Sequence, residues 1–212
     1  MEVVKVQLAR AIWLFDTQEL NPRGSALYPT VFDAFLKRYR FATFPKPEEF
    51  HSGGSLFFKQ GKFAWEVSSV DIDFDLHGDG LVASCRHSTE VADALLRDFV
   101  VWLGEQLGVA YPPSFSKKCI YRSELIVNLA IDLNSTAEKL SRFSRFLSTV
   151  SKQEAQTTGI TFGSDGTPPM FTIERRANVP FEENRYFSSA ALQTTHHIAA
   201  LTAFEQVLGQ SE

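Results

Sequence analysis

The most regular alternation of hydrophobic and polar positions lies between Val70 and Leu76. Val70, Ile72, Phe74 and Leu76 are apolar, and Asp71, Asp73 and Asp75 stand between them. Successive side chains of a strand point to opposite faces, so this segment predicts a strand with one buried face and one carboxylate face. The turn residues 77–80 then predict a hairpin with a second strand at 81–86. In that register Asp73 faces Ser84 and Asp75 faces Val82.

Other segments predict the remaining elements by their apolar spacing. Strands are expected at residues 4–15 and 121–133, with two more between 159 and 174. Apolar stretches at 56–59 and 62–67, on either side of Gln60-Gly61, predict another hairpin. Helical spacing predicts helices at about 29–40, 88–107 and 192–208. The second of these is expected to start with Ser88 as its N-cap and to end near Gly108. A further helix starts with capping-box spacing at Ser135 and Glu138, and it is expected to turn Leu140, Phe143, Leu147 and Val150 inward.

These elements predict an α+β fold with a mainly antiparallel or mixed sheet and about four helices packed on one face. The order strand, helix, strand, strand, helix can be read twice, once on each side of Pro112-Pro113. This order is compatible with an internal pseudo-repeat. We expect a single domain over 1–212, with two packed halves, 1–111 and 112–212, as the alternative organisation.

Composition narrows the class of protein. The chain has 212 residues, of which 44% are hydrophobic, and a formal net charge of -4. This is a globular composition, and it argues against wrapping of nucleic acid by a basic surface. The two cysteines form no framework, no leader pattern is visible, and the apolar stretch 91–107 carries four charges. We therefore expect a cytoplasmic protein with no membrane partner.

The unusual abundance of phenylalanine, 19 residues, directs attention to the aromatic segment 41–65. If its aromatic side chains cannot all enter one core, some of them form an exposed patch of the kind that marks protein interfaces. The candidate binding residues in this segment are Phe41, Phe44, Phe57 and Phe58.

Charge is unevenly distributed along the chain. Residues 70–108 contain eight acidic and two basic side chains, a net charge of -6, whereas residues 115–152 contain seven basic and three acidic ones, a net charge of +4. Two such surfaces could dock head-to-tail or attract charged partners, although solvated helix faces give the same totals. Lys139, Arg142 and Arg145 are the basic candidates for binding. They would also serve a less favoured hypothesis, nucleic-acid binding.

The aspartate row is the strongest chemical signal, because aligned carboxylates can hold a divalent cation. Asp71, Asp73 and Asp75 are thus candidate metal ligands. With Gly54-Ser55 upstream, Asp71 and Asp73 resemble the glycine-serine and paired-aspartate pattern of the nucleotidyltransferase superfamily. The resemblance implies a divalent metal and Ser55 near the phosphates. The strand at 81–86 carries no third acid, and the favoured interpretation is that the aspartates solvate the open face of a sheet.

Motifs of other enzyme classes are missing from the sequence: there is no HExxH, GxSxG or P-loop. The neighbouring His196 and His197 point about 100° apart on a helix and cannot share one ion, so a packed structural histidine is favoured. Our leading hypothesis is a non-enzymatic protein-binding or assembly module that needs no cofactor and contacts another protein or a second copy of itself. The alternative is a metal-dependent nucleotidyltransferase-like enzyme.

Overall fold

A computed structural model describes residues 1–21, 28–46, 49, 54–108, 111, 118–133, 138–165 and 168–209. The turn predicted at 22–25, Pro112-Pro113 and the start of the capping box at Ser135 lie outside these residues, as do the side chains of residues 28–30, 138–140 and 181. The first half of the chain contains β1 (Glu2–Leu14), the 3-10 helix η1 (Thr17–Leu20), α1 (Tyr28–Tyr39), β2 (Leu56–Trp65), β3 (Ser68–His77), β4 (Gly80–Cys85) and α2 (Thr89–Leu107). The second half contains β5 (Lys118–Asn128), α3 (Glu138–Ser151), β6 (Gly159–Phe162), β7 (Phe171–Arg175), the 3-10 helix η4 (Phe181–Glu183), β8 (Arg185–Ala190) and α4 (Thr194–Gly209).

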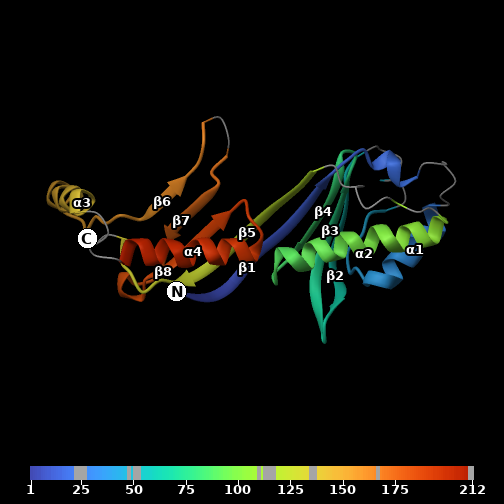
Figure 1. Cartoon of the computed structure of the whole chain (residues 1–212), viewed down its shortest axis with the longest axis horizontal. Coiled ribbons are helices and arrows are strands. Elements are labelled where there is room, and N and C mark those ends of the chain that lie inside the picture. The colour runs from blue at the N-terminus through green and yellow to red at the C-terminus, as the bar shows by residue number, and fades with distance from the viewer. Residues whose placement is uncertain are drawn as a thin grey trace. The chain divides into compact units, whose positions relative to one another are not determined.

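The strands form one eight-stranded antiparallel sheet in the order β2-β3-β4-β1-β5-β8-β7-β6. The described residues add four α-helices, so the predicted α+β class is confirmed. Each half has the same sequence of elements: a strand, a helix, three strands and a helix (Figure 1). The strand orders β2-β3-β4-β1 and β6-β7-β8-β5 are also equivalent. The pseudo-repeat is thus present in the topology, with one more strand per half than the sequence pattern predicts.

The chain divides into two compact units. The N-terminal unit is Leu8–Arg122, and the C-terminal unit combines Met1–Gln7 with Ser123–Glu212. The division into halves at residues 111 and 112 stays a prediction. Among the described residues, no helix has both the length and the apolar character needed to cross a membrane.

Phenylalanine is abundant because the core of the N-terminal unit is built from aromatic rings. The ring of Phe35 on α1 lies at its centre, with centroids 4.9–5.9 Å from those of Tyr39, Phe41, Phe58, Phe74, Phe99 and Trp102. Edge-to-face and tilted pairs of this kind add to the free energy gained by burial. The core therefore joins α1 and α2 to the apolar face of β2 and β3.

Helix α2 has the ends that the sequence predicts. Ser88 adopts an extended backbone, and its hydroxyl accepts a hydrogen bond from the amide of Val91. At the other end, Gly108 has a φ of 63°, a left-handed conformation that favours glycine. The β3–β4 register is also as expected, with Asp73 opposite Ser84 and Asp75 opposite Val82.

The hairpin predicted at Gln60-Gly61 is wrong. β2 runs continuously from Leu56 to Trp65, and its register against β3 shifts between Phe58 and Gly61. Gln60 has a φ of 57°, so the apparent turn is a β-bulge within one strand. Gly61 is needed there because a Cβ would lie 2.5 Å from the Phe41 ring.

The C-terminal unit has its own core, formed by Leu125, Val127, Leu129, Leu133, Ile173, Tyr186 and Leu201. Strand β8 is not predicted from the sequence. Its inward-facing residues are Tyr186, Ser188 and Ala190, and two of these are too small or too polar to register as a hydrophobic alternation. Helix α3 lies apart from α4 at the far end of this unit (Figure 1).

Candidate functional site

The three predicted metal ligands face lysines of β2. The ammonium of Lys59 lies 2.7 Å from Oδ1 of Asp75 and 3.7 Å from Oδ2 of Asp73. Lys62 forms an ion pair with Asp71. Asp75 is buried, Asp73 is half-buried and Asp71 is exposed. Each carboxylate therefore has a counter-charge supplied by the neighbouring strand.

Asp73 also explains how the bulge of β2 is stabilised. Its Oδ1 accepts a hydrogen bond of 2.9 Å from the backbone amide of Gln60, the residue with positive φ. An amide in a bulge has lost its ladder partner, so a side-chain acceptor on the adjacent strand satisfies it. The sequence did not predict this role of Asp73, because it predicted a hairpin at Gln60-Gly61 and not a bulge.

Among the residues that the structure describes, no three His, Cys, Asp or Glu side chains converge in a manner suited to a metal ion. Ser55 lies directly before β2, which begins at the next residue. Its hydroxyl lies 2.7 Å from Nδ1 of His77. Metal binding by Asp71, Asp73 and Asp75 stays a prediction, and it would have to compete with Lys59 and Lys62 for the carboxylates.

The aromatic candidates separate into two groups. Phe41 and Phe58 are buried in the aromatic core, with ring centroids 5.4 Å apart, and offer no contact surface in this structure. Phe44 and Phe57 are exposed. The Phe57 ring lies beside His77 and under the ammonium of Lys59, at 5.7 Å from its centroid. Only Phe44 and Phe57 keep the accessibility that a binding residue needs.

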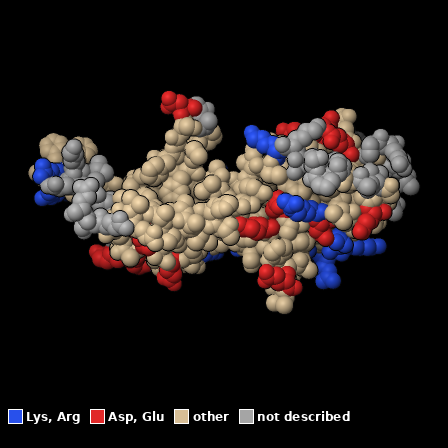
Figure 2. Space-filling view, in the orientation of Figure 1, with Lys and Arg blue, Asp and Glu red and all other residues tan. Residues whose placement is uncertain are grey.

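The acidic character of residues 70–108 is partly cancelled within the N-terminal unit. Lys59 and Lys62 pair with the aspartate row, and Arg38 binds Asp98 through a two-pronged contact at 2.7 and 3.1 Å. These bases lie outside the segment whose charge was counted. Figure 2 shows acidic and basic side chains close together over this unit. The predicted acidic surface is therefore mixed in charge.

The apolar face of helix α3 points outward, opposite to the direction predicted from the sequence. Phe143, Phe146, Leu147 and Val150, named here the α3 stripe, are exposed by 57, 61, 39 and 65%, although Phe143, Leu147 and Val150 were expected inward. The rings of Phe143 and Phe146 are stacked, with centroids 6.4 Å apart. The spacing i, i+3, i+4, i+7 places all four on one side of the helix.

The covered side of α3 is lined by serines instead. Ser144 is buried, and the hydroxyl of Ser148 accepts a 2.9 Å hydrogen bond from the amide of Ala155. Ser151 likewise accepts from the amide of Gln153. The chain that follows the helix thus folds back over its polar side. This return path is why the apolar side faces outward.

The basic candidates accompany the stripe. Arg142 and Arg145 are exposed on α3, and Arg145 contacts the Ser141 carbonyl of its own helix. Figure 2 shows basic side chains at the end of the C-terminal unit where α3 lies. Lys139 belongs to the same helix, but its side chain lies outside the described part. The structure brings Arg142 and Arg145 together with the apolar residues of one helix.

His197 is a structural residue, as favoured by the sequence. It is fully buried in α4, and its Nε2 lies 2.8 Å from the Ser188 hydroxyl, which itself donates to the Thr172 carbonyl. Because that hydroxyl proton is used, Nε2 is the donor toward Ser188. Nδ1 has no hydrogen-bond partner among the described residues. Burial lowers the pKa of His197 to about 4, so the ring is neutral at physiological pH.

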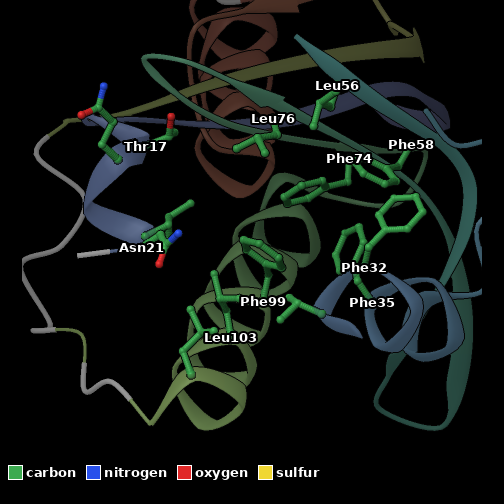
Figure 3. Close-up of a pocket in the computed structure, with 14 residues that line it drawn as sticks. Thr17, Asn21, Phe32, Phe35, Leu56, Phe58, Phe74, Leu76, Phe99 and Leu103 are labelled. Carbon is green, nitrogen blue, oxygen red and sulfur yellow. The ribbon is translucent and has the colours of Figure 1, made fainter. Parts of the chain in front are cut away.

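A pocket of about 260 Å³ opens in the N-terminal unit between the sheet, α1, α2 and η1 (Figure 3). Its walls are almost entirely apolar. The described lining residues are Val31, Phe32, Phe35, Leu56, Phe58, Phe74, Leu76, Phe99, Leu103, Leu107 and Leu20, with Thr17, Gln18 and Asn21 as the polar members. No sequence pattern predicted the pocket, because its walls consist mainly of ordinary core residues from five separate elements.

Comparisons with known proteins give alignments with solved structures but no family. No family model and no curated protein matches the sequence. Among solved structures, Methanococcus jannaschii TBP aligns over 99% of this chain and 98% of that chain, with a TM-score of 0.41 and 11% sequence identity. At that level of similarity, neither membership of a family nor a function follows for this chain.

Proposed function

We propose that this chain is a non-enzymatic protein-binding module, and that the α3 stripe is its contact surface. The observation that carries the proposal is the reversed amphipathic character of α3, which covers serines and exposes two phenylalanines, a leucine and a valine. Exposing such a group together is unfavourable in water, and it is typical of surfaces that another protein covers.

The partner that fits is an amphipathic helix with acidic flanks. An apolar stripe at helical spacing packs against a similar stripe on another helix, and the flanking charges select the partner. Arg142 flanks the stripe next to Phe146, and Arg145 lies further round the helix toward the serine side. Acidic flanks on the partner are therefore complementary, and basic flanks repel. A phosphate backbone would engage the arginines but would leave the phenylalanines exposed.

A different protein is favoured over a second copy. Two α3 helices placed side by side would bring like charges together. In a head-to-tail assembly α3 would meet the acidic side chains of the N-terminal unit. Four of these, Asp71, Asp73, Asp75 and Asp98, are already paired with Lys62, Lys59 and Arg38. Four side chains cover less area than a permanent interface needs, so we expect a transient complex.

The test uses two designed helical peptides with the same apolar stripe, one flanked by glutamates and the other by lysines. Binding to the full chain is followed by fluorescence anisotropy. We expect the acidic peptide to bind more tightly and to weaken as salt is added. Val150→Glu should reduce its affinity at least tenfold, because a charge would be desolvated within the apolar contact.

Val207→Glu is the matched control. Val207 is 69% exposed on α4 of the same unit, against 65% for Val150, so both substitutions place the same charge on an exposed helix position. V207E should bind like the wild type. Equal binding of both peptides, or unchanged binding by V150E, would contradict the proposal. Sedimentation tests the other occupant. If the wild type self-associates and V150E does not, the partner of the α3 stripe is a second copy of this chain and not a different protein.

A further inference from the structure

We infer that the pocket of the N-terminal unit binds an uncharged, unbranched aliphatic molecule of roughly nine carbons, independently of the function proposed for α3. The walls are supplied by Leu56 and Phe58 of β2, Phe74 and Leu76 of β3, and the aromatic and leucine side chains of α1 and α2. Figure 3 shows the labelled Phe32, Phe35, Phe74, Phe99 and Leu103 around one common space.

The size of the pocket sets the size of the occupant. Protein interiors are normally packed without voids larger than a water molecule, and apolar cavities of about 150 Å³ already take up benzene. At about 30 Å³ for each water-sized group, a volume of about 260 Å³ holds roughly nine methylene or methyl groups. A chain of this length fills the space, and a much longer chain leaves part of itself in water.

The polar groups of the pocket define where the head of the molecule lies. Thr17, Gln18 and Asn21 all come from η1 or the residue that ends it, so polarity is confined to one side. Figure 3 places Thr17 and Asn21 together on that side. The Thr17 hydroxyl already donates to the Gly78 carbonyl. Gln18, on the same side, adds a carboxamide whose donor and acceptor suit a hydroxyl or amide head.

The described lining of the pocket offers no counter-charge for a ligand with a carboxylate head. None of the described lining residues is Lys, Arg, His, Asp or Glu. An ionised head placed against these walls would lose its hydration without gaining a counter-charge. The pocket should therefore prefer an alcohol to the carboxylate of the same chain length.

The experiment measures thermal unfolding of the full chain with linear 1-alkanols from hexanol to dodecanol and with nonanoate at pH 8. A ligand that binds only the native state raises the midpoint. We expect affinity to tighten about fourfold for each added methylene, to level off near nonanol, and to be weaker for nonanoate. No rise with any alkanol, or a rise that continues steadily to dodecanol, would overturn the inference.

Val31→Phe and Val101→Phe are the matched variants. Val31 lines the pocket from α1, so the added ring occupies the space intended for the ligand, whereas Val101 is exposed on α2 and does not line it. V31F should lose the alkanol-dependent rise, and V101F should keep it. An equal rise in both variants would show that the alkanols act elsewhere.

Methyl NMR of the wild-type chain with 1-nonanol gives a second measurement of binding. It needs no substituted protein, so it does not depend on whether V31F folds. Shift changes should be confined to pocket leucines such as Leu56 and Leu103. Leu125 and Leu201, in the core of the other unit, should not move. Changes of similar size in both groups would contradict a specific site.

Discussion

The indole Nε1 of Trp13 donates a hydrogen bond of 2.8 Å to Oδ1 of Asp93, 80 residues further along the chain. Both side chains are buried. The second carboxylate oxygen accepts from Nε of Arg97, also at 2.8 Å, and the Tyr121 hydroxyl approaches Oδ1 at 3.3 Å. Asp93 thus ties α2 to β1 and β5 within the N-terminal unit.

Asp93→Ala should lower the free energy of unfolding by about 2–3 kcal/mol, because the Trp13 N–H is left buried without an acceptor. Asp93→Asn should cost less, since its carbonyl oxygen can still accept from Trp13. Glu105→Ala, on the exposed side of the same helix, is the control and should change stability by at most about 0.5 kcal/mol. Urea unfolding measures all three, and an equal loss in D93A and E105A would refute the role assigned to Asp93.

The two lysines of β2 form a matched pair of variants, because Lys59 pairs with the buried Asp75 and Lys62 pairs with the exposed Asp71. Lys59→Ala removes the counter-charge of the buried Asp75 and should cost about 1–2 kcal/mol. Lys62→Ala removes an ion pair whose Asp71 side chain is 78% exposed, and it should cost no more than about 0.5 kcal/mol. Chemical denaturation of the two variants compares them directly. If K62A were as damaging as K59A, burial would not be what makes the pair at Asp75 important.

The glycines of the β3–β4 turn should differ sharply in their tolerance of alanine. A Cβ on Gly80 would lie 2.1 Å from the carbonyl oxygen of Trp13, an atom of the adjacent backbone that cannot move aside. On Gly78 a Cβ would meet nothing within 4 Å. Gly80→Ala should therefore cost at least about 2 kcal/mol and Gly78→Ala less than about 0.5 kcal/mol, measured by thermal or urea unfolding. Equal stability of the two variants would show that β1 does not approach Gly80 this closely.

Sequence reasoning succeeded where one local rule decides the structure. The alternation around Asp71, Asp73 and Asp75 predicted the hairpin register, and Ser88 with Gly108 predicted both ends of α2. In each case the determining residues are neighbours in the chain. The α+β class followed from summing such local signals.

Sequence reasoning failed where a contact from outside the element decides its structure. Gln60-Gly61 has the composition of a turn, but the carboxylate of Asp73 and the ring of Phe41 hold it as a bulge. The stripe of α3 was found by its spacing, and its direction was predicted wrongly because the chain returning to Ala155 occupies the serine side. Neither Phe41 against Gly61 nor Ala155 against Ser148 is visible as a local pattern.

Acid should destabilise the C-terminal unit through His197. Its pKa is about 4 in the folded chain, because the ring is buried, and about 6.5 when the chain is unfolded. As the pH falls below 6.5 the unfolded state binds a proton that the folded state does not, so stability is lost progressively until the pH reaches about 4. Between pH 7 and pH 5 this single residue should remove about 2 kcal/mol from the free energy of unfolding.

The adjacent histidines provide the comparison that assigns this loss. His197→Asn should be less stable than the wild type at pH 7, because the ring packs beside Phe171 and contacts Ser188, but its stability should fall less between pH 7 and pH 5. His196→Asn changes an exposed side chain on the same helix and should keep the wild-type dependence on pH. Urea unfolding at the two pH values measures both slopes. If H197N lost as much stability on acidification as the wild type, the acid sensitivity would belong to other groups and the neutral, buried state of His197 would be excluded.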